Sequence, residues 1–208
     1  MNIDLKDSEI IFKKFSPENF QNAIFIIDLN IDNIYKISST IPQNKYILIR
    51  SGEKTKSLTG FNRIIEFFIK NEVTKSDEMV AIGGGSLLDL TGFTASIYRR
   101  GLNLHFVPTT LLSMADASIG GKNAINHHNY KNLLGTFYLP KSILIDLDFL
   151  KTLPRKYLIS GYIEILKVSM LKSYEFFNYL INNFINYIIN SDLKYLIETS
   201  IDFKVNII

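Results

Sequence analysis

The feature that most constrains the fold of this chain is an alternation of short apolar runs with longer amphipathic stretches. The runs are rich in Ile and Val and cover residues 23–28, 45–50, 79–82, 102–107 and 142–146. Runs of this length predict strands buried on both faces, as in a parallel sheet. Helical spacing between them, over residues 55–72, 86–99 and 109–119, completes a β–α–β rhythm. The sequence therefore predicts an α/β fold with a doubly wound, mostly parallel sheet.

The pattern changes after Asp146. From Lys151 onward no strand-like run is found. Helical spacing covers residues 160–171, 173–190 and 192–208, and Pro154 is a plausible start signal for this region. We predict an α/β domain over residues 1–150 and a helical domain over residues 151–208. The second domain looks short, because little chain follows to cover the broad apolar face of SYEFFNYLINNFINYIIN.

Composition excludes several classes of protein. The 208 residues are 47% hydrophobic and 21% charged, as in a soluble globular protein. A net charge of +3 with scattered basic residues argues against nucleic acid. No cysteine is present, which rules out disulfides and thiolate metal sites. The N-terminal sequence is not that of a signal peptide, and no apolar run approaches the ~18 residues of a membrane span. We expect a cytoplasmic protein without a membrane segment.

A triple-glycine turn is the first candidate for a functional site. In AIGGGSLLDLTGF, the run at 79–82 leads into Gly83–Gly85, and a helix is expected to begin at Ser86. Glycines allow positive φ and close approach of a ligand, and a helix N-terminus offers free N–H groups. Together they would form a seat for a pyrophosphate. The pattern is not the G-x-G-x-x-G fingerprint, so a tight turn that binds nothing is an equally good interpretation.

A second segment favours the binding interpretation. VPTTLLSMADASIGGK and NHHNYKNLLG follow the strand at 102–107. Thr109 and Thr110 should lie at the same edge of the sheet as the glycines, where open α/β sheets bind ligands. Two lysines near glycine turns, Lys122 and Lys131, suit an anionic substrate. For any one of these residues alone, a capping threonine or a solvated lysine is the preferred explanation.

Taken together, these segments resemble the 3-dehydroquinate synthases, a family of sugar-phosphate cyclases. The match is carried, in the family's order, by GGGSLLDLTGF, YRRGLNLHFVPTTLLSMADASIGGKNAIN, KNLLGTFYLPKSILIDLDFLKTLP and GYIEILKVSML, and more loosely by IIDLN and SGEKTKSL. The resemblance implies NAD, a divalent metal (zinc or cobalt) and usually a homodimer. It also implies the substrate 3-deoxy-D-arabino-heptulosonate 7-phosphate. NAD would take a hydride from C5 of this substrate and return it later.

The resemblance further implies roles for individual residues. Residues of the cofactor site would be Asp28, Asn30, Glu53, Lys56, Gly84, Gly85, Ser86, Leu87, Asp89, Thr109, Thr110, Lys122, Lys131, Phe149, Leu150, Lys151 and Thr152. Asp89 would hold a cofactor hydroxyl or the loop. Residues of the substrate site would be Asp116, Lys122, Asn132, Lys167 and Arg100, the last reaching a neighbouring subunit's site. Lys204 is a candidate for a further substrate lysine.

The metal site is the weak point of the resemblance. Glu164 matches the family's first metal ligand, and at i, i+3 it shares a helix face with Lys167. From spacing alone, a surface ion pair is the better explanation. The family adds two histidines later in the helical domain, whereas this chain has His105 in a predicted strand and His127 and His128 in the predicted loop before Lys131. A catalytic zinc normally takes three protein ligands, so we expect an incomplete site.

Three alternatives remain open. The first is a sister cyclase that acts on another sugar phosphate. The second is a metal-dependent polyol dehydrogenase. Such an enzyme eliminates no phosphate, so the lysines of GGK and KN argue against it. The third is an inactive NAD-binding remnant or assembly subunit. The presence of Asp116, Lys122, Asn132, Glu164 and Lys167 argues against the third.

We expect the 208-residue chain to be inactive by itself, because one carboxylate cannot hold a catalytic metal tightly. A turnover assay of the purified chain with metal and NAD⁺ checks this expectation. Clear formation of product would contradict it.

Overall fold

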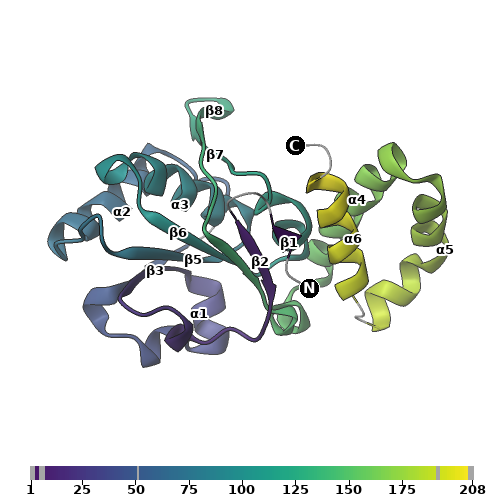
Figure 1. Ribbon diagram of the computed structural model, residues 1–208, viewed down its shortest axis with the longest axis horizontal. Helices are drawn as coiled ribbons and strands as arrows, with labels where there is room; N and C mark the ends of the chain where they lie inside the picture. The colour runs from purple at the N-terminus through teal and green to yellow at the C-terminus, as the bar shows by residue number, and fades with distance from the viewer. Residues whose placement is uncertain (1–2, 5–7, 51, 191–192, 206–208) are drawn as a thin grey trace.

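A seven-stranded sheet forms the centre of the larger part of the molecule (Figure 1). The computed structural model describes residues 3–4, 8–50, 52–190 and 193–205. The strands of the sheet are β1 (Ile3–Asp4), β2 (Glu9–Phe12), β3 (Ala23–Asp28), β4 (Tyr46–Ile49), β5 (Glu78–Gly83), β6 (Asn103–Pro108) and β9 (Ser142–Ile145). Their order is β1-β2-β9-β6-β5-β3-β4, and all neighbours are parallel except β1 and β2. The predicted mostly parallel sheet is confirmed.

The five predicted strands correspond to β3, β4, β5, β6 and β9, and β2 was not predicted. β2 has four residues, of which the first is Glu9, is followed by Lys13, and pairs in parallel with β9 near the edge of the sheet. Such a short run carries too few apolar residues to reveal a strand. Its partner β9 is buried at every position, which is why that strand could be read from the sequence.

The strand order reverses between β3 and β5. From β3 the chain passes to β4 on one side, whereas β5, β6 and β9 follow one another on the other side. Successive crossovers therefore diverge at the carboxyl ends of β3 and β5. In open α/β sheets this is the place where ligands bind.

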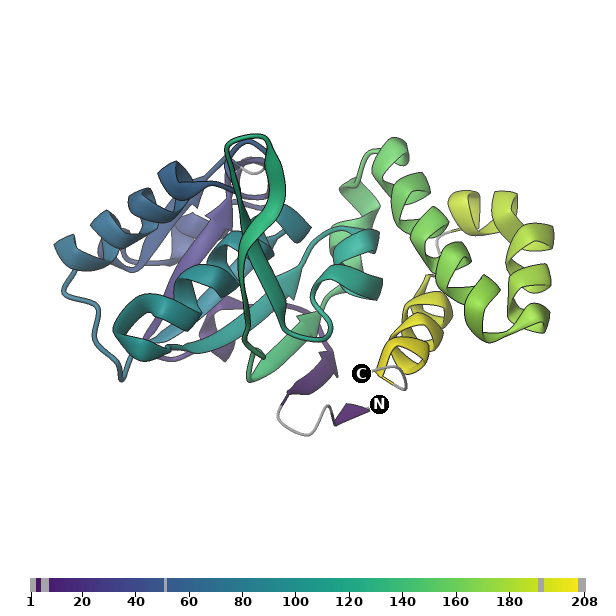
Figure 2. The same cartoon turned by 90° about the horizontal axis from the view of Figure 1, so that it is seen from above.

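Helices cover both faces of the sheet. α2 (Leu58–Lys70) and α3 (Gly85–Ile97) lie on one face, and α1 (Leu29–Tyr35) lies on the other (Figures 1 and 2). α2 buries Gly60, Ile64 and Phe68, four residues apart, as expected of an amphipathic surface helix. α3 is buried over most of its surface, because it lies between the sheet and a hairpin.

That hairpin consists of β7 (Lys122–His127) and β8 (Tyr130–Phe137) and stands out from the α/β part in Figure 1. It packs on α3 at Gly92, where an added Cβ would lie 1.9 Å from Oδ1 of Asn123. The sequence analysis placed His127 and His128 in a loop. This was wrong for His127, which ends β7, whereas His128 lies in the turn. Polar residues in this two-stranded ribbon concealed its strand character.

Short helical turns connect the main elements. The 3₁₀ turns are η1 (Pro17–Asn19), η2 (Ile37–Thr40), η3 (Gln43–Lys45), η4 (Tyr98–Arg100) and η6 (Leu147–Thr152), and η5 (Ser113–Ala117) is a π-helical turn. The helix predicted over 109–119 is therefore shorter, spanning residues 111–117.

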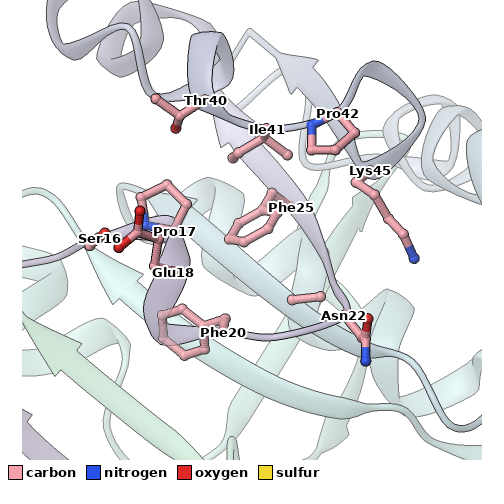
Figure 3. A pocket seen from close by; sticks show the side chains of 11 residues that line it. Ser16, Pro17, Glu18, Phe20, Asn22, Phe25, Thr40, Ile41, Pro42 and Lys45 are labelled. Carbon is pink, nitrogen blue, oxygen red and sulfur yellow. The ribbon is translucent and has the colours of Figure 1, made fainter.

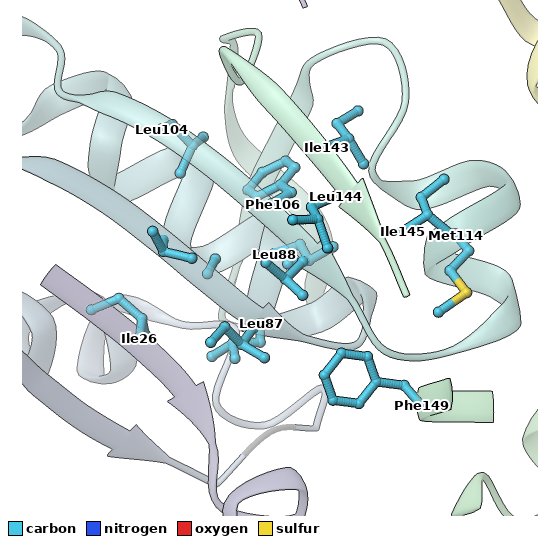
Figure 4. Close-up of a cluster of buried hydrophobic side chains, with 14 of the residues drawn as sticks. Ile26, Leu87, Leu88, Leu104, Phe106, Met114, Ile143, Leu144, Ile145 and Phe149 are labelled. Atoms are coloured by element: carbon cyan, nitrogen blue, oxygen red, sulfur yellow. The ribbon is translucent and has the colours of Figure 1, made fainter. Parts of the chain in front are cut away.

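The apolar core fills the space between the sheet and its helices. Figure 4 shows Ile26, Leu88 and Phe106 among its members. His105 is packed in β6, as predicted, with Nδ1 2.8 Å from Oγ of Ser142. Burial lowers the pKa of His105 against the opposing effect of Glu78, so the imidazole is a structural group.

Three helices follow the sheet: α4 (Arg155–Lys172), α5 (Tyr174–Asn190) and α6 (Lys194–Val205). The predicted helices are confirmed, although α4 begins earlier, directly after Pro154. Residues 192 and 206–208 of the last predicted helix lie outside the described residues. α4 and α6 pack against η5, which joins the helical part to the sheet. None of the helices in the described ranges is both long enough and apolar enough to span a membrane.

Candidate cofactor and substrate site

A cavity of about 510 Å³ opens at the carboxyl ends of β3 and β5. It lies where the strand order reverses. Its lining comes from five segments that the sheet brings together: Asp28, Asn30, Ile31 and Ile34; Gly52; Gly84, Gly85 and Ser86; Thr109, Thr110 and Leu112; and Phe149, Thr152, Leu153, Pro154, Tyr157 and Ser160. Nine of the predicted cofactor residues therefore line one cavity.

The glycine turn leaves room for a ligand through its lack of side chains. Gly84 has φ −80° and ψ 174°, so the positive φ considered from the sequence is not used. A Cβ on Gly84 would lie 3.2 Å from Cγ2 of Thr110, and one on Gly85 would lie 3.1 Å from Cβ of Ala117. No described side chain caps the start of α3. Its first N–H groups are therefore free to bind an anion.

Asp28 lies at the end of β3, on one side of the cavity. Its carboxylate accepts a hydrogen bond of 2.9 Å from the amide of Asn30 and so caps α1. Both residues line the cavity. The cap fixes the carboxylate at the sheet edge, where an acid can accept hydrogen bonds from ribose hydroxyls.

Thr109 carries the clearest sign of a missing partner. Its side chain is 1% exposed and lines the cavity. Within the described part of the chain, its Oγ1 finds no hydrogen-bond partner. The neighbouring Thr110 Oγ1 lies 2.8 Å from Oγ of Ser113. Because buried hydroxyls are nearly always paired, the free Thr109 hydroxyl fits a bound ligand.

Eight predicted cofactor residues do not line the cavity, and Leu87, Leu150 and Lys151 are three of them. Leu87 and Leu150 are buried in the apolar core. Lys151 is exposed and pairs with Asp148 at 2.5 Å. The sequence analysis missed Tyr157 and Ser160, which line the cavity from α4. The start signal at Pro154 could have indicated them, since the first turns of a helix after a strand point toward the sheet edge.

A buried polar network connects α3 to the hairpin. Lys56, 5% exposed, donates to Oδ2 of Asp89 and to Oδ1 of Asn132. Burial raises the pKa of the Asp89 carboxyl, although the hydrogen bond from Lys56 opposes this. Asn132 has φ 55°, and its amide donates to Oδ1 of Asn126 at 2.9 Å. Asp89 contacts Lys56, in the segment before α2, and its predicted role toward the cofactor stays a prediction.

The network borders a second hollow of about 520 Å³ below the hairpin tip. Glu53, Lys56 and Lys131 line it, and Glu53 accepts from Asn126 Nδ2 at 2.7 Å. None of these three lines the cavity at Gly84. Twelve of the seventeen predicted cofactor residues thus line one or the other of these two hollows. The five that line neither are Leu87, Asp89, Lys122, Leu150 and Lys151.

Two predicted substrate residues meet at η5. The Nζ atom of Lys204, on α6, lies 2.6 Å from the carbonyl oxygen of Asp116 and 2.7 Å from its Oδ1. Lys122 is exposed on β7, and Arg100 is exposed just before β6, at the end of that strand opposite to Thr109. Arg100 therefore cannot serve the cavity of its own chain.

The candidate metal ligand lies in an ion pair. On α4, Glu164 is half-buried and Lys167 is exposed, and Nζ of Lys167 lies 3.2 Å from Oε2 of Glu164. No group of three His, Cys, Asp or Glu side chains suited to a metal ion occurs among the described residues. Glu164 can thus supply a single ligand.

A third hollow, of about 380 Å³, lies at the amino end of β3 and contains none of the predicted site residues. Figure 3 shows its mostly apolar lining, with Phe20, Phe25 and Ile41. It faces the end of the sheet opposite to the cavity. The candidate site residues therefore lie at the carboxyl ends of the strands and not at this hollow.

Comparison with known proteins agrees with this arrangement. The family model "3-dehydroquinate synthase N-terminal" matches residues 46–160. The chain belongs to this family. It is 42% identical over 82% of its length to the 3-dehydroquinate synthase of Saccharolobus solfataricus, and 41% identical over 77% to that of Alkaliphilus metalliredigens. It covers 48% and 46% of these relatives, so it spans about half their length.

Solved structures of sugar-phosphate cyclases share the fold. The 2-epi-5-epi-valiolone synthase of Streptomyces hygroscopicus, with NAD⁺ and Zn²⁺ bound, matches with a TM-score of 0.85 and 25% identity, over 96% of this chain and 60% of its own. A 2-deoxy-scyllo-inosose synthase complexed with carbaglucose-6-phosphate, NAD⁺ and Co²⁺ matches with a TM-score of 0.70 and 26% identity, over 81% of this chain and 51% of its own.

Replacing Lys56 by Met should destabilise the fold by about 2–4 kcal/mol near neutral pH, since it leaves the Asp89 carboxylate largely buried without its cation. Burial already raises the pKa of Asp89 above 3.8, and loss of Lys56 raises it further. The penalty is therefore complete above the folded-state pKa and disappears as the pH falls toward 3.8. Urea unfolding at several pH values measures it.

Two controls accompany this prediction. K56M/D89N should recover part of the lost stability, because no buried charge remains. K45M breaks the surface pair with Asp77, at 3.5 Å, and should cost less than about 1 kcal/mol. Equal losses in K45M and K56M would show that the network is not a buried ion pair.

Proposed function

We propose that this chain provides the NAD-binding part, and part of the substrate site, of a 3-dehydroquinate synthase. The reaction would convert 3-deoxy-D-arabino-heptulosonate 7-phosphate to 3-dehydroquinate and phosphate. The observation that carries the proposal is the cavity at Gly84 and Gly85, with the Thr109 hydroxyl, which has no partner among the described residues, in its wall. The family assignment supports the same function.

The choice among cyclases rests on identity. Curated 3-dehydroquinate synthases are 38–46% identical over most of this chain. The valiolone and scyllo-inosose synthases are 25–26% identical. The polyol dehydrogenase alternative receives less support, because a glycerol dehydrogenase matches with a TM-score of only 0.53. These differences favour a heptulosonate phosphate as substrate.

The proposed seat for NAD uses the chain's own polar groups. Asp28 and Asn30 would bind ribose hydroxyls, and the first amides of α3 would bind the pyrophosphate. Thr109 would donate its free hydroxyl to the cofactor. When bound, NAD would accept a hydride from C5 and return it, so that phosphate can leave between the two transfers.

The proposed substrate site is prepared by the buried network. Lys56 occupies Oδ1 of Asn132, so the Asn132 NH₂ group remains a donor for phosphate oxygens. Lys122 and Lys167 would add positive charge. Lys204 neutralises Asp116, which reduces repulsion between this acid and an anionic substrate. We include Lys204 in the site for this reason.

A divalent metal enters the proposal only through Glu164. The neighbours were solved with Zn²⁺ or Co²⁺, but the described residues of this chain do not form a site for either ion. We therefore assign no step of the reaction to a metal held by these residues.

Thr109→Val should weaken NAD binding by about three- to tenfold, the effect of losing one hydrogen bond. Its stability should be unchanged, because the hydroxyl has no partner in the described structure. Ser118→Ala is the matched control, since its hydroxyl is also buried and unpaired among the described residues but does not line the cavity. Calorimetric titration with NAD measures both. Equal affinities of the two variants would contradict the proposed seat.

Substrate choice can be tested by binding, which does not require turnover. With NAD present, the chain should bind 3-deoxy-D-arabino-heptulosonate 7-phosphate at least about tenfold more tightly than carbaglucose-6-phosphate. Inorganic phosphate is the control for general anion binding, and Lys122→Met should reduce the affinity for the sugar phosphate. Preference for carbaglucose-6-phosphate would favour a sister cyclase instead.

A further inference from the structure

Tyr35, the last residue of α1, joins this helix to η6, and both elements contribute to the lining of the cavity at Gly84. The Tyr35 hydroxyl lies 3.0 Å from the carbonyl oxygen of Asp148 and 2.8 Å from Oγ1 of Thr152. Its ring packs on Phe149 in a T-shaped arrangement, with the centroids 5.0 Å apart. Phe149 and Thr152 line the cavity, whereas Tyr35 does not. Tyr35 can therefore act on a ligand through these two neighbours.

The direction of the Tyr35 hydrogen bonds follows from the number of protons. A tyrosine hydroxyl has one proton to donate, and a carbonyl oxygen can only accept. Because Tyr35 donates to the Asp148 carbonyl, the proton between Tyr35 and Thr152 is that of Thr152. Another acceptor for the Thr152 hydroxyl is the Phe149 carbonyl at 3.4 Å, which also belongs to the protein. A protein group thus takes the Thr152 proton, and the lone pairs of Oγ1 remain for a ligand.

Thr109 and Thr152 therefore offer different groups to a ligand, although both line the cavity. The Thr109 hydroxyl has no partner among the described residues, so it can turn to donate or to accept. The Thr152 hydroxyl is held by Tyr35 and can only accept. At Thr152 the protein thus determines that the ligand group must be a donor.

The lining near Thr152 is apolar. Phe149 lies in the same 3₁₀ turn, and Ile31 lies one helical turn before Tyr35, so that both line the cavity on this side. Apolar walls with one polar group at their border suit a flat aromatic base. In the seat proposed for NAD, Asp28 binds the ribose and the start of α3 binds the pyrophosphate. The adenine then lies beyond the ribose, between α1 and η6.

We propose that Tyr35 is a positioning residue that makes Thr152 an acceptor for the amino group of the adenine base. Adenine has a donor NH₂ group at the position where an oxopurine has an acceptor oxygen. An acceptor at Thr152 binds the first group and repels the second, because lone pairs would then face each other. The cavity would thus prefer an aminopurine dinucleotide to an oxopurine one. This assignment rests on the proposed function, since it places NAD in the cavity.

The alternative is a purely structural role for Tyr35. Loss of its hydroxyl would then loosen the contact between α1 and η6 and weaken every nucleotide by the same factor. The two roles differ in the ratio of two affinities, which a general loosening of the cavity leaves unchanged. The ratio for NAD and nicotinamide hypoxanthine dinucleotide is therefore the decisive quantity, since these two molecules differ in the group at that position of the base.

Calorimetric titration of the chain with each dinucleotide measures this ratio. The wild-type chain should bind NAD about three- to tenfold more tightly than the hypoxanthine analogue, the effect of one hydrogen bond. Tyr35→Phe should reduce the preference to less than about twofold, because the Thr152 hydroxyl can then turn and donate to the oxo group. Thr152→Val should also lose the preference, whereas Thr152→Ser, which keeps the hydroxyl, should retain it.

Tyr98→Phe is the matched control. The Tyr98 hydroxyl also donates to a backbone carbonyl, that of Val73 at 2.8 Å, and its ring packs on Phe68 in a T-shaped arrangement with the centroids 4.9 Å apart. None of these three residues lines the cavity. Y98F should therefore keep the wild-type preference, and circular dichroism shows whether Y35F and Y98F are folded.

The role of Tyr35 is contradicted if the wild-type chain binds both dinucleotides equally, or if Y35F weakens both by the same factor and keeps the preference. If Y35F does not fold, the Thr152 variants decide, because equal ratios in T152V and T152S also contradict it. In these cases the proposed function stands as long as NAD binds and Thr109→Val weakens it. A chain that binds neither dinucleotide contradicts both proposals.

Discussion

The structure depends on the close approach of side chains to the glycine backbone where β5 turns into α3. At Gly83 an added Cβ would lie 2.6 Å from Cδ2 of Leu87, and at Gly84 it would reach Thr110. Side chains at these positions would push α3 away from the sheet and fill the space between the ends of β5 and β6. The cavity exists because this turn has no side chains. The same packing keeps α3 close to the sheet, in the position where the hairpin residue Asn123 packs against Gly92.

The hairpin is held by polar contacts at one end and by packing at the other. At its base, Asn123 fits against Gly92 and donates to the carbonyl oxygens of Gly121 and Tyr138. Toward its tip, Lys56 joins Asn132 to Asp89. The buried ammonium of Lys56 donates to both the Asp89 carboxylate and the Asn132 amide, so it fixes the orientation of the Asn132 side chain as well as its distance from α3. It therefore fixes which atoms of Asn132 remain available to a ligand.

The sequence predicted the sheet well because its central strands are buried on both faces and read as continuous apolar runs. It predicted the cavity through Gly84 and Thr109, which follow those strands directly. The sequence-based prediction failed for residues that belong to a matching motif but whose side chains point away from the cavity. Leu87 and Leu150 belong to matching segments, yet helix geometry turns them into the core. Tyr157 lies in the cavity; its apolar pattern is that of any amphipathic helix, and only its place in the first turn after Pro154 could have indicated it.

Glu164 and Lys167 also show that residue spacing alone does not determine what a side chain binds. Their spacing permits both a metal ligand beside a substrate lysine and a simple ion pair, and in the structure they form the pair. An exposed pair of this kind contributes little stability, so either partner can be recruited by a stronger ligand at small cost. Lys204 differs, because it is largely covered and makes two hydrogen bonds to Asp116. The contact through η5 is thus the stronger link between the helical part and the sheet, and it holds Asp116 in place whether or not Glu164 binds a metal.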